Sequence, residues 1–191
     1  MKLLGVCGSP RPGGNSEQLL DLALGVVAGE GITTEKITLA GKVVGGCTAC
    51  MKCREAKDGL CHGRDDDLTP VIPRVYAADG LLLATPVYFG AATAETVAFV
   101  DRVGYVARQN GGLLRGKVGS PIVVARRAGA NFTVAQLNYF FLINGMVVPG
   151  ASYWPIAFGG AKGEALKDEE GVRTVRDLAA HVARLLRQRN A

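Results

Sequence analysis

The sequence predicts an α/β protein in which helices cover both faces of a parallel sheet. Short apolar runs alternate with longer segments whose apolar residues recur at helical spacing, and the alternation continues along the whole chain. The 191 residues leave room for one domain, and 48% of them are hydrophobic, which suffices for a sizeable core. We therefore expect residues 1–191 to form a single domain.

Five apolar runs are the expected strands, because short runs between helical patterns are typical of parallel strands covered on both faces. These runs are Leu3–Cys7, Thr34–Leu39, Gly80–Ala84, Val118–Ala125 and Met146–Val148.

Five amphipathic segments are the expected helices. The first has the best-marked start, since Asn15 is a candidate N-cap with Gln18 three residues later, and Gly29 marks its end. Asp65–Asp67 supply negative charge at the start of the second, and Gly145 closes the fourth. The later four are Leu68–Ala77, Thr93–Arg108, Phe132–Asn144 and Glu169–Arg189.

One segment, about residues 40–64, breaks the alternation. It follows the second strand, shows no usable apolar period and holds four of the five cysteines. We therefore expect a cysteine-rich loop whose structure depends on something other than core packing. The chain is too long and too poor in cysteine for a disulfide framework, and no secretory signal precedes it, so a reducing cytoplasm is expected.

The overall composition excludes several classes of partner. No apolar run is long enough to span a membrane, so no membrane partner is expected. The net charge is +5, but aromatic residues make up only 6% and no nucleic-acid motif is present. Binding of anionic cofactors accounts for the basic excess, and no nucleic-acid partner is expected.

The loop directly after the first strand has the features of a phosphate site. It precedes a helix, whose first N–H groups and dipole attract anions, and its glycines let the backbone approach a ligand. Further donors are Ser9, Arg11, Asn15 and Ser16. The loop is neither Gly-x-Gly-x-x-Gly nor a lysine-bearing P-loop. An ordinary turn with a helix cap is the alternative.

Two further loops should meet the first at the same edge of the sheet, where ligands of open parallel sheets bind. The loop after the third strand offers flat apolar surface and a stiffened backbone for a planar ring, and its residues are Pro86, Val87, Tyr88, Phe89 and Gly90. Arg126 and Arg127 follow the fourth strand and could neutralise a phosphate or a reduced anionic ring. Packing aromatics and a solvated arginine pair are the alternatives.

The clustered cysteines have the spacing Cys-x2-Cys-x2-Cys-x7-Cys. Three thiolates at steps of three can wrap one iron–sulfur cluster, and the fourth can close it. A tetrahedral zinc site and a reversible disulfide are the other two interpretations. The candidate metal ligands are Cys47, Cys50, Cys53 and Cys61. The fifth, Cys7, is expected to be a small core residue.

Together, the Gly-Ser-Pro-Arg opening, Pro-Val-Tyr-Phe-Gly and Ala-Arg-Arg resemble the flavodoxin-like, NADPH-dependent FMN reductase superfamily, and the cysteine run resembles its iron–sulfur flavoproteins. The resemblance implies a doubly wound five-stranded sheet in the order 2-1-3-4-5. It implies FMN with its phosphate against the first loop and its isoalloxazine near Pro86–Gly90, and a [4Fe-4S] cluster. It also implies a ferredoxin-like electron donor and a homodimer or homotetramer.

The expected function is an FMN-dependent oxidoreductase that passes electrons between FMN and a [4Fe-4S] cluster. The cofactors supply the chemistry, so no catalytic side chain is expected. An NAD(P)H-dependent FMN or quinone reductase without a cluster is the first alternative, with NAD(P)H as donor and substrate. A zinc-knuckle binding module is the second.

Overall fold

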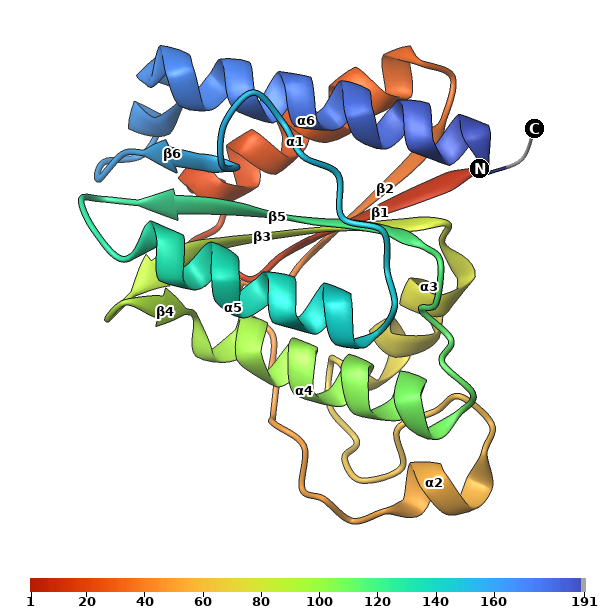
Figure 1. The fold of residues 1–191 in the computed structure, drawn as a ribbon. Helices are drawn as coiled ribbons and strands as arrows, with labels where there is room; N and C mark the ends of the chain where they lie inside the picture. The colour runs from red at the N-terminus through yellow and green to blue at the C-terminus, as the bar shows by residue number, and fades with distance from the viewer. Residues whose placement is uncertain (190–191) are drawn as a thin grey trace.

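The computed structural model describes residues 1–189, and its centre is a twisted sheet with helices on both faces (Figure 1). The five parallel strands lie in the order β2-β1-β3-β5-β6, which confirms the predicted order 2-1-3-4-5. The strands are β1 (Lys2–Cys7), β2 (Thr33–Thr38), β3 (Gly80–Tyr88), β5 (Val118–Ala125) and β6 (Ile156–Phe158), with the two-residue β4 (Ala91–Ala92) antiparallel to β3.

The helices divide into two layers (Figure 1). One layer contains α1 (Asn15–Gly29) and α6 (Glu169–Gln188), and the other contains α3 (Ile72–Ala77), α4 (Ala94–Gln109) and α5 (Ala130–Ile143). Each layer buries its own apolar cluster against the sheet, because strands covered on both faces need apolar side chains on both. Two 3₁₀ turns, η1 (Thr69–Val71) and η2 (Glu164–Lys167), precede α3 and α6.

The fifth strand is not where the sequence pattern predicted it. Met146–Val148 contributes only an isolated bridge, between Val147 and Val118, and Pro149 then directs the chain out of the sheet. The chain returns at β6, which pairs with the carboxyl half of β5. The return brings residues 159–164 to the carboxyl edge of the sheet, beside the loop after β1.

The start of α1 also differs from the prediction. Gly14 is the N-cap residue and supplies no side-chain bond. The Asn15 amide instead donates to the carbonyl of Ala161 at 2.9 Å and accepts from the N–H of Gly163 at 2.7 Å. Asn15 therefore joins two loops that are far apart in the sequence.

The cysteine-rich segment follows β2 and lies against the side of α4 that faces away from the sheet (Figure 1). It is irregular apart from the short helix α2 (Lys52–Ala56), which the sequence did not predict. Met51 and Lys57 flank α2 with positive φ angles of 61° and 52°, so left-handed residues start and end this turn. Within residues 1–189, no helix has the length and apolarity that a membrane crossing needs.

Candidate functional site

A cleft of about 630 Å³ lies at the carboxyl ends of β1, β3 and β5, a size typical of cofactor sites. Most of the predicted cofactor residues line it, namely Ser9, Arg11, Asn15, Ser16, Pro86, Val87, Tyr88 and Arg126. Phe89, Gly90 and Arg127 do not: Phe89 is fully exposed with a φ of 50°, and Arg127 is exposed. Three loops thus converge on one cleft, as the order of the strands requires.

The first loop holds an anion-binding arrangement at the start of α1. Ser9 is buried, and its Oγ accepts the N–H of Arg11 at 3.2 Å, which fixes the turn. The N–H of Gly13 donates to the Glu17 carboxylate at 2.7 Å. Within residues 1–189, the N–H groups of Asn15, Ser16 and Glu17 have no hydrogen-bond acceptor. They remain for a ligand at the positive end of the helix dipole.

Three buried threonines, Thr85, Thr93 and Thr96, connect the floor of the cleft to α4. No pattern in the sequence marked them as part of the site. Thr93 Oγ1 donates to the carbonyl of Gly8 at 2.6 Å and contacts Thr96 Oγ1 at 2.8 Å, and Thr96 Oγ1 lies 3.0 Å from Thr85 Oγ1. A Cβ on Gly8 would lie 1.9 Å from Thr96 Oγ1. Only glycine therefore allows the β1 loop to dock on α4.

The loop at residues 159–164 forms a wall of the cleft that sequence reasoning also missed. Glu164 accepts the N–H groups of Gly160 and Ala161 at 2.7 and 2.8 Å, and these two bonds hold the pKa of its carboxyl below the usual value. Lys162 reaches back over the first loop, because a Cβ on Gly13 would lie 2.9 Å from its Nζ. The wall thus adds a cation to Arg11 and Arg126, which a phosphate would need.

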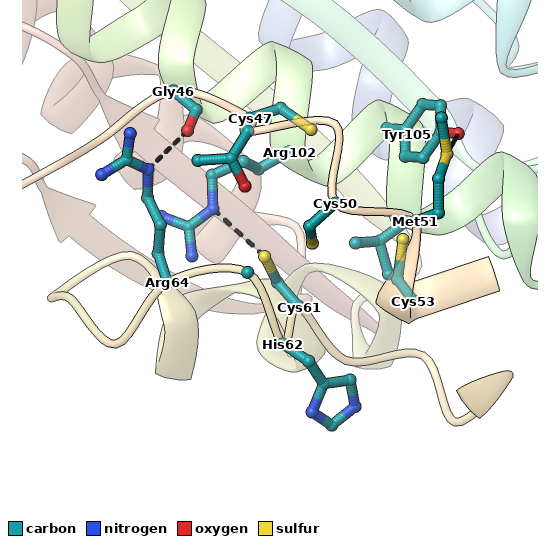
Figure 2. Close-up of a pocket in the computed structure, with 13 residues that line it drawn as sticks. Gly46, Cys47, Cys50, Met51, Cys53, Cys61, His62, Arg64, Arg102 and Tyr105 are labelled. Carbon is teal, nitrogen blue, oxygen red and sulfur yellow. Dashed lines mark hydrogen bonds between the residues drawn. The ribbon is translucent and has the colours of Figure 1, made fainter. Parts of the chain in front are cut away.

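The four clustered cysteines line a second, smaller pocket, between the cysteine-rich segment and α4 (Figure 2). Cys50, Cys53 and Cys61 turn their sulfurs toward its middle, and Cys47 lies higher in the view. All four are free thiols. Within residues 1–189, no three His, Cys, Asp or Glu side chains are spaced to hold a single metal ion. The four thiols nevertheless line the same pocket, so their grouping in the sequence is also a grouping in space.

The thiols differ in their environment. The N–H of Lys52 donates to Cys50 and lowers its pKa, so the thiolate is favoured at an exposed position. Burial raises the pKa of Cys53, and the neighbouring cysteines add to the shift. Cys7 lies apart in the core, where burial raises its pKa to about 11. Among the five thiols, only the four clustered ones line a common pocket.

The donor set of the pocket suits an iron–sulfur cluster. It offers four soft sulfur donors without an intervening carboxylate. The enclosed space of about 20 Å³ holds little more than one water, so binding of a cluster would require Cys47 and Cys50, which lie on exposed irregular backbone, to move outward. A Cβ on Gly63 would lie 2.8 Å from Cys50 Sγ, so glycine allows the returning arm to approach.

An ion pair holds together the two ends of the cysteine-rich segment, residues 43–45 and 66–69, which we call its neck. Arg102 on α4 is 1% exposed, and its Nη1 donates to both Asp66 oxygens at 2.6 and 2.7 Å. Asp66 also accepts the N–H of Gly45 at 2.9 Å, and Asp67 accepts that of Val43 at 2.7 Å. Asp66 accepts the N–H groups of Leu68 and Thr69 too, so the predicted helix-start role is only part of what it does.

The helix α4 links the two sites. Thr93 at its start belongs to the threonine cluster under the cleft, whereas Arg102 and Asn110 bind the cysteine-rich segment. Its 16 residues correspond to about 24 Å of helix. The cleft and the cysteine pocket are thus held by different turns of one rigid element.

The comparisons with known proteins agree with this architecture. Residues 1–161 match the NADPH-dependent FMN reductase family. An iron–sulfur flavoprotein from Methanocaldococcus jannaschii is 38% identical over 98% of each chain, and one from Methanosarcina thermophila is 33% identical over 97% of this chain and 95% of its own. The solved structure of RosB with a bound formylriboflavin phosphate intermediate superimposes with a TM-score of 0.80 at 20% identity, covering 100% of this chain and 80% of RosB.

The order of the strands and the cleft at their carboxyl edge define a flavodoxin-like fold, which confirms the predicted fold class. The chain belongs to the NADPH-dependent FMN reductase family, among the iron–sulfur flavoproteins. It is therefore an FMN-dependent oxidoreductase, and the predicted resemblance is confirmed.

Proposed function

We propose that this protein passes electrons between FMN in the cleft and a [4Fe-4S] cluster in the cysteine pocket. The observation that carries the proposal is the placement of all four clustered cysteines around one pocket, in a chain whose fold provides a separate cofactor cleft. The names of the relatives support it, because several are called iron–sulfur flavoproteins.

The cleft residues would bind and orient FMN. The free N–H groups at the start of α1 would bind its phosphate, with Arg11 and Lys162 adding charge. Pro86, Val87 and Tyr88 would hold the ring system, and Arg126 would stabilise negative charge on reduced flavin. FMN supplies hydride and single-electron chemistry when bound, so the chain needs no acid, base or nucleophile of its own.

Cys47, Cys50, Cys53 and Cys61 would be the cluster ligands. When bound, a [4Fe-4S] cluster accepts and releases single electrons. The chain is too long and too poor in cysteine for a disulfide framework, and such chains are typical of a reducing compartment, so we propose a cytoplasmic location. A ferredoxin-like protein or NAD(P)H would be the electron donor.

The outer face of α5 is the proposed contact between copies of the chain. Phe132 and Tyr139 are 78% and 73% exposed, and Leu142 and Ile143 extend the same apolar face. Burial of this face would explain a homodimer or homotetramer. Replacement of Tyr139 by Glu should shift the protein to monomer in sedimentation velocity.

Purification without oxygen, followed by metal, sulfide and flavin analysis, tests the proposal. We expect FMN together with about four iron and four sulfide per chain. Cys50→Ser should lose the iron and keep the FMN, because Cys50 lies in the other pocket. Cys7→Ala is the matched control: this thiol is buried in the core, so both cofactors should remain.

Other outcomes would select the alternatives. FMN without iron would identify a cluster-free NAD(P)H-dependent FMN or quinone reductase. Stoichiometric zinc in a colourless protein would favour the zinc-binding module. The absorption spectrum and metal content of a single sample distinguish the three.

A further inference from the structure

Arg102 is buried, yet none of its polar contacts lies on its own helix. Its Nη1 contacts Asp66 and the carbonyl of Gly45, the latter at 3.3 Å, and its Nη2 donates to Thr69 Oγ1 at 2.7 Å. Its Nε donates to Cys61 Sγ at 3.4 Å (Figure 2). One guanidinium therefore forms hydrogen bonds with the first part of the cysteine-rich segment, at Gly45, and with its returning part, at Cys61 and beyond.

The contact with Cys61 differs in kind from the others. Gly45, Asp66 and Thr69 offer oxygen atoms and fix the neck of the segment, whereas Cys61 offers the sulfur that would bind iron. Arginine suits this double role, because its rigid fork donates in several directions at once and stays charged. A lysine could not hold both arms and the sulfur together.

The charge on Arg102 is also important at this position. Asp66 opposes it, since the two side chains are 0% and 7% exposed and the oxygen lies 2.6 Å from the nitrogen. Hydrogen bonds to ligand sulfurs and nearby positive charge favour the reduced, more negative state of an iron–sulfur cluster. Arg102 and Asp66 thus place opposite charges next to Cys61.

We propose that Arg102 is a positioning residue that holds Cys61 in place as the fourth cluster ligand and raises the reduction potential of the cluster through its bond to that sulfur. This inference rests on the proposed function, because it requires a cluster in the cysteine pocket. Asp66 opposes the effect by neutralising Arg102.

Two substitutions should shift the potential in opposite directions. Arg102→Gln removes the charge and the Nε donor, so the midpoint potential should fall. Asp66→Asn keeps the shape but leaves the Arg102 charge unbalanced, so the potential should rise. We expect each to change the reduction equilibrium about tenfold, which is about 59 mV for one electron. The measurement is a redox titration of the purified holoprotein, followed by electron paramagnetic resonance.

Asn110→Ala is the matched control. Asn110 also lies at α4 and holds the same segment, through the carbonyl of Cys53 at 3.2 Å and the N–H of Gly59 at 3.0 Å, but it contacts no sulfur. It should loosen the segment without changing any charge near the sulfurs, so its shift in potential should be well below that of Asp66→Asn. If Arg102→Gln does not retain iron, a comparison of the midpoint potentials of Asp66→Asn and Asn110→Ala still shows whether the charge of Arg102 raises the potential.

The outcomes separate this inference from the proposed function. A wild-type protein without iron would overturn both. A wild-type protein with its cluster, and an Asp66→Asn potential equal to that of wild type or shifted downward, would overturn only the role of Arg102. Equal shifts in Asp66→Asn and Asn110→Ala would also overturn it, because they would indicate loosening rather than charge.

Discussion

The cleft and the cysteine pocket are built in opposite ways. Loops at the ends of paired strands form the cleft, so the backbone ladder of the sheet fixes where they start. The cysteine pocket has no strand, and its neck depends on Arg102, Asp66 and Asp67. A site of the first kind is set by topology, whereas one of the second kind depends on a few polar side chains, whose loss should affect it alone.

The largest expected effect is the loss of the buried pair. Arg102→Met leaves Asp66 buried without its partner, which should lower the free energy of unfolding of the cofactor-free protein by about 3–5 kcal/mol. Limited proteolysis should then cut the cysteine-rich segment first, and the folded fraction should still bind FMN. Arg108→Met on the exposed face of the same helix is the control: it removes one exposed hydrogen bond, to the carbonyl of Ile143, so the expected change is about 1 kcal/mol or less. Equal decreases in the free energy of unfolding in both variants would show that the cysteine-rich segment does not depend on the buried pair.

A crowded glycine provides the corresponding test of the cleft. In Gly8→Ala the new Cβ meets Thr96 Oγ1, which should lower the free energy of unfolding by about 1–3 kcal/mol and weaken FMN binding. Cysteine accessibility to a thiol reagent should stay as in wild type. Gly25→Ala is the control, because a Cβ there meets nothing within 4 Å in an exposed helix position, so the change should be neutral or stabilising. Altered thiol reactivity in Gly8→Ala would show that the sites are not independent.

Acid should act on the cysteine-rich segment through Asp66. Burial opposes its ionisation, but the bonds from Arg102 and Gly45 outweigh burial and lower its pKa. A carboxyl with a lowered folded pKa stabilises the fold above its unfolded pKa of about 3.9, and this is lost as the pH falls through the folded value. The stability difference between wild type and Asp66→Asn should therefore shrink as unfolding is measured from about pH 6 down to about pH 2. A constant difference would contradict the assignment.

The smallest effect is expected at the cleft wall. Lys162→Ala should weaken FMN binding about threefold at low salt, and less at high salt, because an exposed charge is screened. Lys42→Ala, an exposed lysine near the neck of the cysteine-rich segment, should leave the affinity unchanged. Fluorescence titration of FMN into the flavin-free protein measures both. Equal weakening would assign the effect to net charge rather than to the wall.

Much of the architecture was predictable, because it follows from local patterns. Burial on both faces makes parallel strands continuously apolar, so β1, β3 and β5 were visible as runs. The fifth strand was misplaced because both Met146–Val148 and Ile156–Phe158 are short apolar runs, and only pairing with β5 selects the second. Pro149, directly after the first run, is the one local signal against it.

The sequence by itself determined the fold class and the two groups of chemically active residues, and its resemblance to a known family implied the order of the strands. Glycine-rich loops after strands and closely spaced cysteines are local features, so they could be recognised along the chain. Only the tertiary structure decided that Asn15 holds a loop 146 residues away and that Arg102 contacts Cys61. Such contacts join residues distant in sequence, and the backbone path, which local patterns do not specify, determines which of them meet.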